Sequence, residues 1–246
     1  MSNPFHQRES LDRPIDVPQL TAEQILARVL HRDGLMLVID KPAGLPVHRG
    51  PKGGPNLEAS FDALRFGLPR PPVLAHRLDK DTSGCLVLGR HRKATASLGL
   101  LFKHGKISKT YWAIVEGGPA EDEGTIDMPL GRLNAERGWW QKVDPEGQQA
   151  VTNWKVMGRG EGLTWLALEP VTGRTHQLRV HSSAQGWPIF GDNIYGNGPR
   201  FGEPRLHLHS REIGIPISKN KEPVRVVAPA PEHMRERLRA CGWNGE

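Results

Sequence analysis

The chain has 246 residues and a mass of 27.3 kDa, which fits one large domain or two small ones and excludes a peptide or minimal disulfide scaffold. Lys and Arg outnumber Asp and Glu by 33 to 27, and the resulting net charge of +6 favours a polyanionic partner. Hydrophobic residues make up 37% of the chain, so global disorder is excluded, although 28 Gly and 21 Pro predict many loops.

Cysteine content and apolar run length predict where the protein works. Cys85 and Cys241 are too few for a disulfide framework, and the first residues lack the apolar region of a signal peptide. The longest apolar runs, such as residues 35–39, are far shorter than the roughly 20 residues that span a bilayer. We therefore expect a cytoplasmic, monomeric protein that does not enter a membrane.

The predicted elements, taken in chain order, indicate one continuous domain after a short arm. Residues 1–20 carry scattered prolines and charges without periodicity and predict a loosely ordered arm, while residues 21–246 form the domain. Thr21 and Gln24 fit a capping box that begins a helix. The apolar face of that helix would comprise Ile25, Leu26, Val29 and Leu30.

Further along, apolar runs and alternation predict strands, and 3.6-residue periodicity predicts helices. The predicted strands are 35–39, 85–89, 108–116, 149–157, 163–171, 205–213 and 223–228, and the predicted helices are 56–66, 92–104, 175–185 and 231–240. The strands come in consecutive runs rather than in strict alternation with helices, and no Gly-rich phosphate loop is present. This pattern favours an α+β fold over a dinucleotide-binding sheet.

A polar loop at residues 76–84 lies between a Pro-rich stretch and an apolar strand. Four of its residues match the first half of a calcium-binding loop, but Arg90 takes the position of the glutamate that completes such a site, so we reject this interpretation. None of the histidine pairs along the chain comes with a full ligand set at metal spacing, and we expect no metal. A surface turn remains an alternative for the loop on composition alone.

Residues 85–112 contain six cations and no Asp or Glu. Such a run is often only a solvated face, but beside a polar loop it favours contact with phosphates and makes nucleic acid the leading partner. The expected contacts to an RNA backbone are Arg90, Arg92, Lys93, Lys103 and Lys106.

Two more segments carry candidate chemistry. In the strand 108–116, Lys109 and Tyr111 share one face, although ordinary half-buried positions would give the same pattern. Arg174 follows Gly173 at the start of a predicted helix, where a cation opposes the helix dipole and requires a compensating anion. A carboxylate from another segment would provide that anion, and an exposed Arg174 is the alternative.

Taken together, residues 76–84, 108–111 and 173–181 resemble the RluA family of pseudouridine synthases. The resemblance extends from about Asp33 to about Pro231, and His76 distinguishes this branch from a related one that has Gly there. It also includes the segments Asp40-Lys41-Pro42-Ala43-Gly44, Pro188-Ile189-Phe190-Gly191-Asp192 and Tyr195-Gly196.

The resemblance implies an α+β pseudouridine synthase fold, with a mixed, largely antiparallel sheet, flanking helices and a central active-site cleft. Asp79 corresponds to the aspartate that attacks the target uridine, and Arg77 to the side chain that fills the gap left by the flipped-out nucleotide. Tyr111 corresponds to the tyrosine that stacks on the base and is a candidate acceptor of the C5 proton, and Arg174 to the arginine that pairs with the aspartate. The expected substrate contacts are His76, Arg77, Lys109, Thr175, His176, Gln177 and Arg179.

The chemistry of the reaction agrees with these assignments. Moving the glycosidic bond of uridine from N1 to C5 involves no net oxidation or reduction, so we expect neither a cofactor nor a metal. A base within a stacked helix cannot reach a carboxylate, so the nucleotide must leave the stack at a cost of a few kcal/mol. The expected partner is ribosomal or transfer RNA.

Two departures and two alternatives accompany the resemblance. About 30 residues precede Asp33, too few for the RNA-binding module of many members, and Gly214-Ile215-Pro216 departs from the usual end of a late strand. An inactive RNA-binding protein is one alternative, but the Asp, Tyr and Arg that it would lack are all present. A hydrolase with Asp79 and Asp81 as a pair is the other; we expect these side chains to point in opposite directions on an extended segment.

Overall fold

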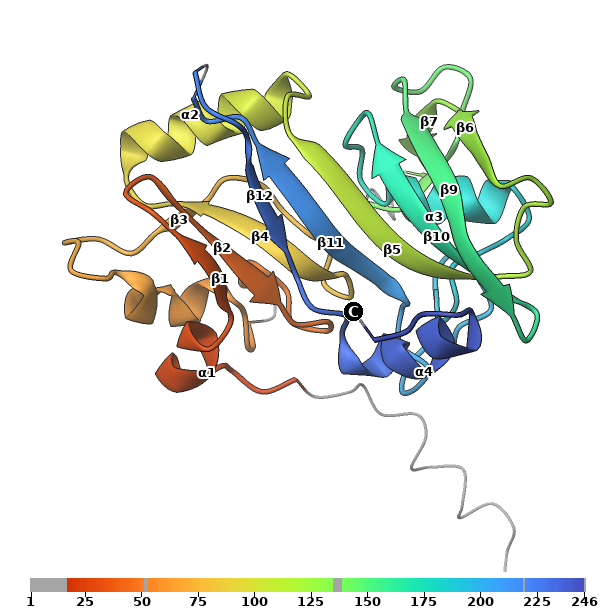
Figure 1. Ribbon diagram of the computed structural model, residues 1–246, viewed down its shortest axis with the longest axis horizontal. Helices are drawn as coiled ribbons and strands as arrows, with labels where there is room; N and C mark the ends of the chain where they lie inside the picture. Colours follow the sequence, from red (N-terminus) through yellow and green to blue (C-terminus); the bar gives the residue numbers. More distant parts are fainter. Residues whose placement is uncertain (1–16, 51–52, 135–138, 219, 246) are drawn as a thin grey trace, which may run out of the picture.

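A ten-stranded sheet runs through the computed structural model, which describes residues 17–50, 53–134, 139–218 and 220–245 (Figure 1). The main path through the sheet is β1-β2-β4-β11-β5-β10-β9-β6, with β12 added to β11 and β3 added to β4. Every strand pair is antiparallel except β11 with β4. The predicted α+β fold with a mixed, largely antiparallel sheet is therefore confirmed.

The strands of this sheet are β1 (Val29–Arg32), β2 (Met36–Lys41), β3 (Val73–Leu74), β4 (Ser83–Gly89), β5 (Ser108–Glu116), β6 (Glu123–Asp127), β9 (Val151–Gly160), β10 (Leu163–Pro170), β11 (Leu208–Ile215) and β12 (Val224–Val227). A second sheet contains only β7 (Leu130–Arg132) and β8 (Gln141–Val143). Strand β11 continues through Ile215, so Gly214 and Ile215 do not interrupt it.

The helices are α1 (Ala22–Leu26), the 3-10 helix η1 (Glu58–Leu64), α2 (Arg92–Lys103), α3 (Gln177–Ala184) and α4 (Glu232–Ala240). Thr21 and Gln24 form the predicted capping box. The helix that it begins ends at Leu26, however, and Val29 and Leu30 belong to β1 instead of continuing its apolar face. No helix within the described ranges has the length and apolar character needed to cross a bilayer.

Strand alternation divides the core into two layers, one on each face of the sheet. Tyr111, Ala113 and Val115 point to one face, and Trp112 and Ile114 point to the other, as the sequence predicts. Helices η1 and α3 cover the Tyr111 face, and α2 and α4 cover the Trp112 face. Residues from both halves of the sheet thus meet at Tyr111, which packs against two core clusters.

The arm expected over residues 1–20 lies outside the described residues up to residue 16. Its end is bound to the domain, because Gln19 Nε2 donates to Asn56 O at 2.8 Å and to Ser60 Oγ at 2.7 Å. Leu20 packs against the cluster beneath η1. Gln19 and Leu20 therefore belong to the domain rather than to the expected arm.

Candidate active site

Asp79 lies in the loop at residues 75–82, which connects β3 to β4. Leu78 is 6% exposed and packs into the core beneath η1, so it anchors the loop from below. The side chain of Asp79 is 33% exposed, and residues 79–82 turn through a hydrogen bond from Thr82 N to Asp79 O of 3.2 Å. The loop thus presents one carboxylate to solvent above a buried leucine.

Lys41, at the end of β2, holds this loop from inside. Its fully buried ammonium donates to Pro42 O at 2.9 Å and to Lys80 O and Thr82 O at 2.8 Å each. Burial lowers the pKa of Lys41 to about 7, although the charges of Asp81, Asp79 and Asp40 oppose that change. Because its three donors take three carbonyls, Lys41 fixes the backbone on which Asp79 is carried.

His76 anchors the beginning of the loop. Its Nε2 accepts a hydrogen bond from Val87 N at 3.0 Å, and its ring stacks on Phe102 of α2 at a centroid distance of 4.2 Å. Burial, assisted by the charge of Lys109, lowers the pKa of His76 to about 3 and keeps the ring neutral. Contact of His76 with substrate stays a prediction, whereas Arg77 is exposed and accessible to RNA.

Tyr111 lies on the same face of the sheet as Asp79. Burial raises the pKa of its phenol above the ordinary value, and the charge of Asp79 adds to this effect, while a side-chain interaction with Ser210 opposes it. The hydroxyl therefore stays protonated. Lys109, two residues before it, lies close to Gly173, and burial lowers its pKa.

His176 connects Asp79 to the other half of the sheet. Its Nε2 is 3.7 Å from Asp79 Oδ2, and its Nδ1 is 2.7 Å from the Tyr195 hydroxyl. Gln141 N donates to that hydroxyl at 2.9 Å, so Tyr195 joins His176 to the backbone at the start of β8.

Arg179 is the buried cation of the site. It forms a bidentate pair with Asp192 through Nε to Oδ2 at 2.8 Å and Nη2 to Oδ1 at 2.7 Å. Burial acts to lower the pKa of Arg179, but the hydrogen bonds and charge of Asp192, together with the charges of Asp79 and Asp81, raise it. Arg179 is therefore, like Lys41, a buried cation whose charge interacts with Asp79 and Asp81.

The predicted pair between Arg174 and Asp79 is wrong in the structure. Arg174 is exposed, and its Nε donates to Gln149 O at 3.0 Å. The helix begins later than expected because His176 adopts a left-handed conformation, with φ of 54°, and α3 begins at Gln177. Arg174 and the exposed Thr175 thus lie in the turn before the helix, whereas Arg179 lies on the buried side of the helix.

The side chain of Gln177 connects the turn before α3 to β9. Its Oε1 accepts from Thr172 Oγ1 at 2.7 Å and from Arg174 N at 3.0 Å. Its Nε2 donates to Val151 O and to Thr152 Oγ1, both at 2.9 Å. These bonds close the turn before α3, and contact of Gln177 or Thr175 with substrate stays a prediction.

Asp81 lies in a turn. The expectation that it points away from Asp79 assumed an extended segment, and that assumption is wrong. The charges of Asp79 and Asp81 act on the same partners, Lys41, His176 and Arg179. Both carboxylates therefore belong to one electrostatic cluster.

The basic stretch divides into one internal cation and four exposed ones. The prediction that Arg90 contacts phosphate is wrong, because its guanidinium instead donates to the backbone at Asp33 O, 2.6 Å away, and at Phe66 O, 3.3 Å away. Arg92, Lys93 and Lys103 are exposed on α2, and Lys106 is exposed just after it. Phe102 brings the end of α2 against His76, so Lys103 and Lys106 lie at the end of the helix that is near the loop at residues 75–82.

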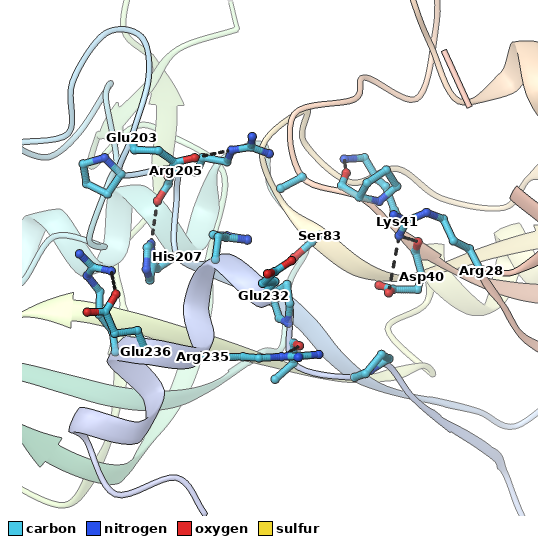
Figure 2. A pocket seen from close by; sticks show the side chains of 18 residues that line it. Arg28, Asp40, Lys41, Ser83, Glu203, Arg205, His207, Glu232, Arg235 and Glu236 are labelled. Carbon is cyan, nitrogen blue, oxygen red and sulfur yellow. Dashed lines mark hydrogen bonds and ion pairs between the residues drawn. The ribbon is translucent and has the colours of Figure 1, made fainter. Parts of the chain in front are cut away.

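A groove of about 790 Å³ opens on the Trp112 face, between the end of β2, residues 203–207 and the first turn of α4 (Figure 2). Figure 2 shows Glu203 and Arg205 on one side of it and Asp40 and Arg28 on the other. Its lining includes neither Asp79 nor Tyr111. Within the described residues, no group of three or more His, Cys, Asp or Glu side chains has the arrangement of a metal site.

Sequence reasoning assigned no role to Lys41, Tyr195 or Asp192, although their segments belong to the resemblance. An apolar strand that ends in a lysine could have indicated a buried ammonium, but its partner carbonyl at Lys80 is 39 residues away. Trp139, edge-on to His176 at 5.5 Å, was also missed, and only its aromatic character in a Gly-rich region marks it.

Comparison with known proteins agrees with this geometry. A family model described as RNA pseudouridylate synthase matches residues 35–184. An uncharacterised RNA pseudouridine synthase of Zymomonas mobilis is 43% identical over 207 residues, covering 83% of this chain and 94% of that protein. The Bacillus subtilis protein called uncharacterised RNA pseudouridine synthase YhcT is 34% identical over 235 residues, covering 92% of this chain and 77% of that protein.

Solved structures show the same relationship. The structure of human RNA pseudouridylate synthase domain containing 4 matches with a TM-score of 0.74 at 29% identity, covering 89% of this chain and 95% of that one. Human RNA pseudouridylate synthase domain containing 1 matches with a TM-score of 0.72 at 28% identity, covering 92% and 90%. The chain therefore belongs to the RluA family of RNA pseudouridine synthases, which are isomerases.

Proposed function

We propose that the protein converts particular uridines of ribosomal or transfer RNA to pseudouridine, with Asp79 as the nucleophile and the target nucleotide flipped out of its stack. The observation that carries this proposal is the carboxylate of Asp79, which is 33% exposed, lies 3.7 Å from His176 Nε2 and interacts electrostatically with Tyr111 and Arg179. Such a carboxylate can attack the uridine while the cation stabilises its charge. We also propose that this takes place in the cytoplasm.

In the reaction, the bond between ribose C1′ and N1 breaks, a bond between C1′ and C5 forms, and the C5 proton leaves as N1 gains one. The protonated phenol of Tyr111 favours stacking and hydrogen-bond donation over a role as the proton acceptor. Lys41 keeps the loop carbonyls in place as the carboxylate reacts. Arg77, exposed beside Asp79, is positioned to occupy the space of the flipped nucleotide.

The test maps pseudouridine in RNA from cells that lack the protein and from cells that carry wild type, Asp79→Asn or Asp122→Asn. We expect sites to disappear without the protein, to return with wild type and the exposed control Asp122→Asn, and not to return with Asp79→Asn. The RNA in which sites disappear identifies the substrate. Restoration of the sites by Asp79→Asn would contradict the nucleophile assignment.

A further inference from the structure

Trp139, immediately before Trp140 and β8, exposes a large indole beside the candidate site. Its side chain is 58% exposed, whereas aromatic side chains of this size are buried for most of their area in folded proteins. Contact between an indole and water is unfavourable, and that free energy is recovered when a partner covers the ring. The position of Trp139 therefore indicates a binding surface.

The two rings next to Trp139 do not use it for parallel stacking. The His176 ring lies at a centroid distance of 5.5 Å and an angle of 87°, and the Trp140 ring lies at 5.7 Å and 81°. Both contacts are edge-to-face arrangements. Among the described residues, no ring is stacked parallel on the indole, and its 58% exposure leaves area that a nucleobase can cover.

The indole and the carboxylate of Asp79 both lie against one imidazole. His176 contacts Trp139 at a centroid distance of 5.5 Å and places Nε2 at 3.7 Å from Asp79 Oδ2. This spacing suits two neighbouring nucleotides of one strand, one at Asp79 and the next at Trp139.

Charge around the indole favours a nucleic acid over a protein partner. Arg132, exposed at the end of β7, pairs with Gln141 across the hairpin. Arg174 is exposed on the turn that precedes His176. An exposed aromatic ring with exposed cations on the neighbouring segments is the combination with which proteins hold single-stranded RNA.

We propose that Trp139 is a stacking platform for the nucleobase next to the target uridine, an inference that rests on the proposed function and extends it to a second base. Truncation of one base-stacking side chain weakens binding by roughly 5- to 100-fold. Recognition would depend little on the identity of this base, because every base has a face to stack.

The test is a cycle between protein and RNA variants. Short single-stranded RNAs with one uridine carry either normal bases or an abasic site directly before or after it, and dissociation constants and single-turnover conversion are measured at low salt. The proteins are wild type, Trp139→Ala, Trp139→Phe and the control Val227→Ala, which removes a 47% exposed side chain on β12. We expect Trp139→Ala to bind normal RNA roughly 5- to 100-fold more weakly, and Trp139→Phe and the control to lose little.

An abasic site on one side of the uridine should weaken RNA binding by wild type by the same factor as Trp139→Ala does. The same abasic site should not weaken binding by Trp139→Ala any further. Equal loss by Trp139→Ala on normal and abasic RNAs would assign Trp139 to support of His176 and would overturn the proposal, as would unchanged binding or a wild type that binds none of these RNAs. The binding cycle does not depend on turnover. If the Trp139 substitution and the abasic site are coupled in binding but no uridine is converted, only the proposed function is refuted. If uridine is converted but the two changes are not coupled, only this inference is refuted.

Discussion

The loop at residues 75–82 and the segment at residues 172–181 meet between Asp79 and His176, but they hold their side chains in different ways. The loop is fixed through its backbone carbonyls by Lys41, a residue from another strand. The segment is fixed by two of its own buried side chains, Gln177 and Arg179, both in α3. The position of Asp79 thus depends on a lysine that is distant in sequence, whereas the position of Arg179 depends on where a helix begins.

The cation on the α3 side, Arg179, forms a fully buried ion pair with Asp192. Arg179 and Asp192 are 3% and 0% exposed, so neither charge is neutralised by water. Burial acts to raise the pKa of Asp192, but the hydrogen bond and charge of Arg179 keep it below its ordinary value. The same side chain therefore stabilises the fold and provides the field at Asp79.

The largest expected effect separates Arg179 from Arg174. Arg179→Met leaves the buried Asp192 without its charged partner, which should cost about 3–5 kcal/mol of unfolding free energy and abolish conversion of uridine. Arg174→Met loses one exposed hydrogen bond to Gln149 O, and should cost less than about 1 kcal/mol and leave conversion within a few fold. Urea unfolding and single-turnover rates check both values.

The double variant Arg179→Met/Asp192→Leu keeps this test informative if the single variant does not fold. It removes both buried charges and should recover most of the stability. Recovery of stability without recovery of conversion would show that the charge of Arg179 acts on Asp79. Loss of conversion in Arg174→Met at normal stability would contradict the assignment and restore Arg174 as the essential arginine.

The second prediction concerns the loop. Lys41→Met keeps the shape of the buried side chain but leaves Thr82 O without its donor, which should cost about 1–3 kcal/mol and reduce kcat more than KM, because Asp79 is less well positioned. Steady-state kinetics and urea unfolding measure the two effects. Lys155→Met, on the exposed side of β9, is the control. An equal change of kcat in both variants would show that the loop does not need the lysine.

Most of the architecture could be predicted because it follows from local pattern. The strand expected at residues 108–116 has the same bounds in the structure, since its alternation fits only a strand with two buried faces. Helix α2 ends one residue earlier than expected. The two-residue strand β3 and the three-residue strands β7 and β8 could not be predicted, because so few residues show no periodicity. Strand β1 was missed because Val29 also fits the apolar face of a helix.

The site could be predicted only where spacing along the chain fixes it. Asp79 follows a buried leucine within a short loop, and its neighbours in the sequence predicted that it lies in a polar loop. Arg174 and Arg179 are both cations near one helix start, and the left-handed His176 decides which of them is buried. That backbone angle depends on tertiary contacts with Tyr195, and no local pattern indicates it.

The third prediction concerns acid. His76 accepts a bond from Val87 N as a neutral ring, with a folded pKa of about 3 against 6.5 in the unfolded chain. Below pH 6.5 the unfolded state binds the proton first, so this group removes about 1.4 kcal/mol of stability per pH unit as the pH falls toward 3. Urea unfolding from pH 7 to 4 should show a shallower loss for His76→Asn than for wild type.

His104→Asn, which changes an exposed histidine just after α2, is the matched control and should follow the wild-type curve. Parallel curves for wild type and His76→Asn would mean that the ring gains its proton without breaking the contact with β4. The acid dependence would then come from other buried histidines, such as His209, whose pKa burial lowers to about 3.

The smallest expected effect tests whether the basic stretch joins the catalytic loop in binding RNA. Lys103 and Lys106 lie at the end of α2 that Phe102 attaches to His76, whereas Arg92 and Lys93 lie at the other end, about 15 Å away along the helix. Lys103→Ala/Lys106→Ala should lower the log–log salt dependence of RNA affinity by roughly 0.7–0.9 for each lost phosphate contact. The matched variant Arg92→Ala/Lys93→Ala should leave that slope unchanged, because its cations lie far from the loop. Equal reduction by both variants would show that RNA follows the whole helix, and no change in either would show that α2 is only a solvated face.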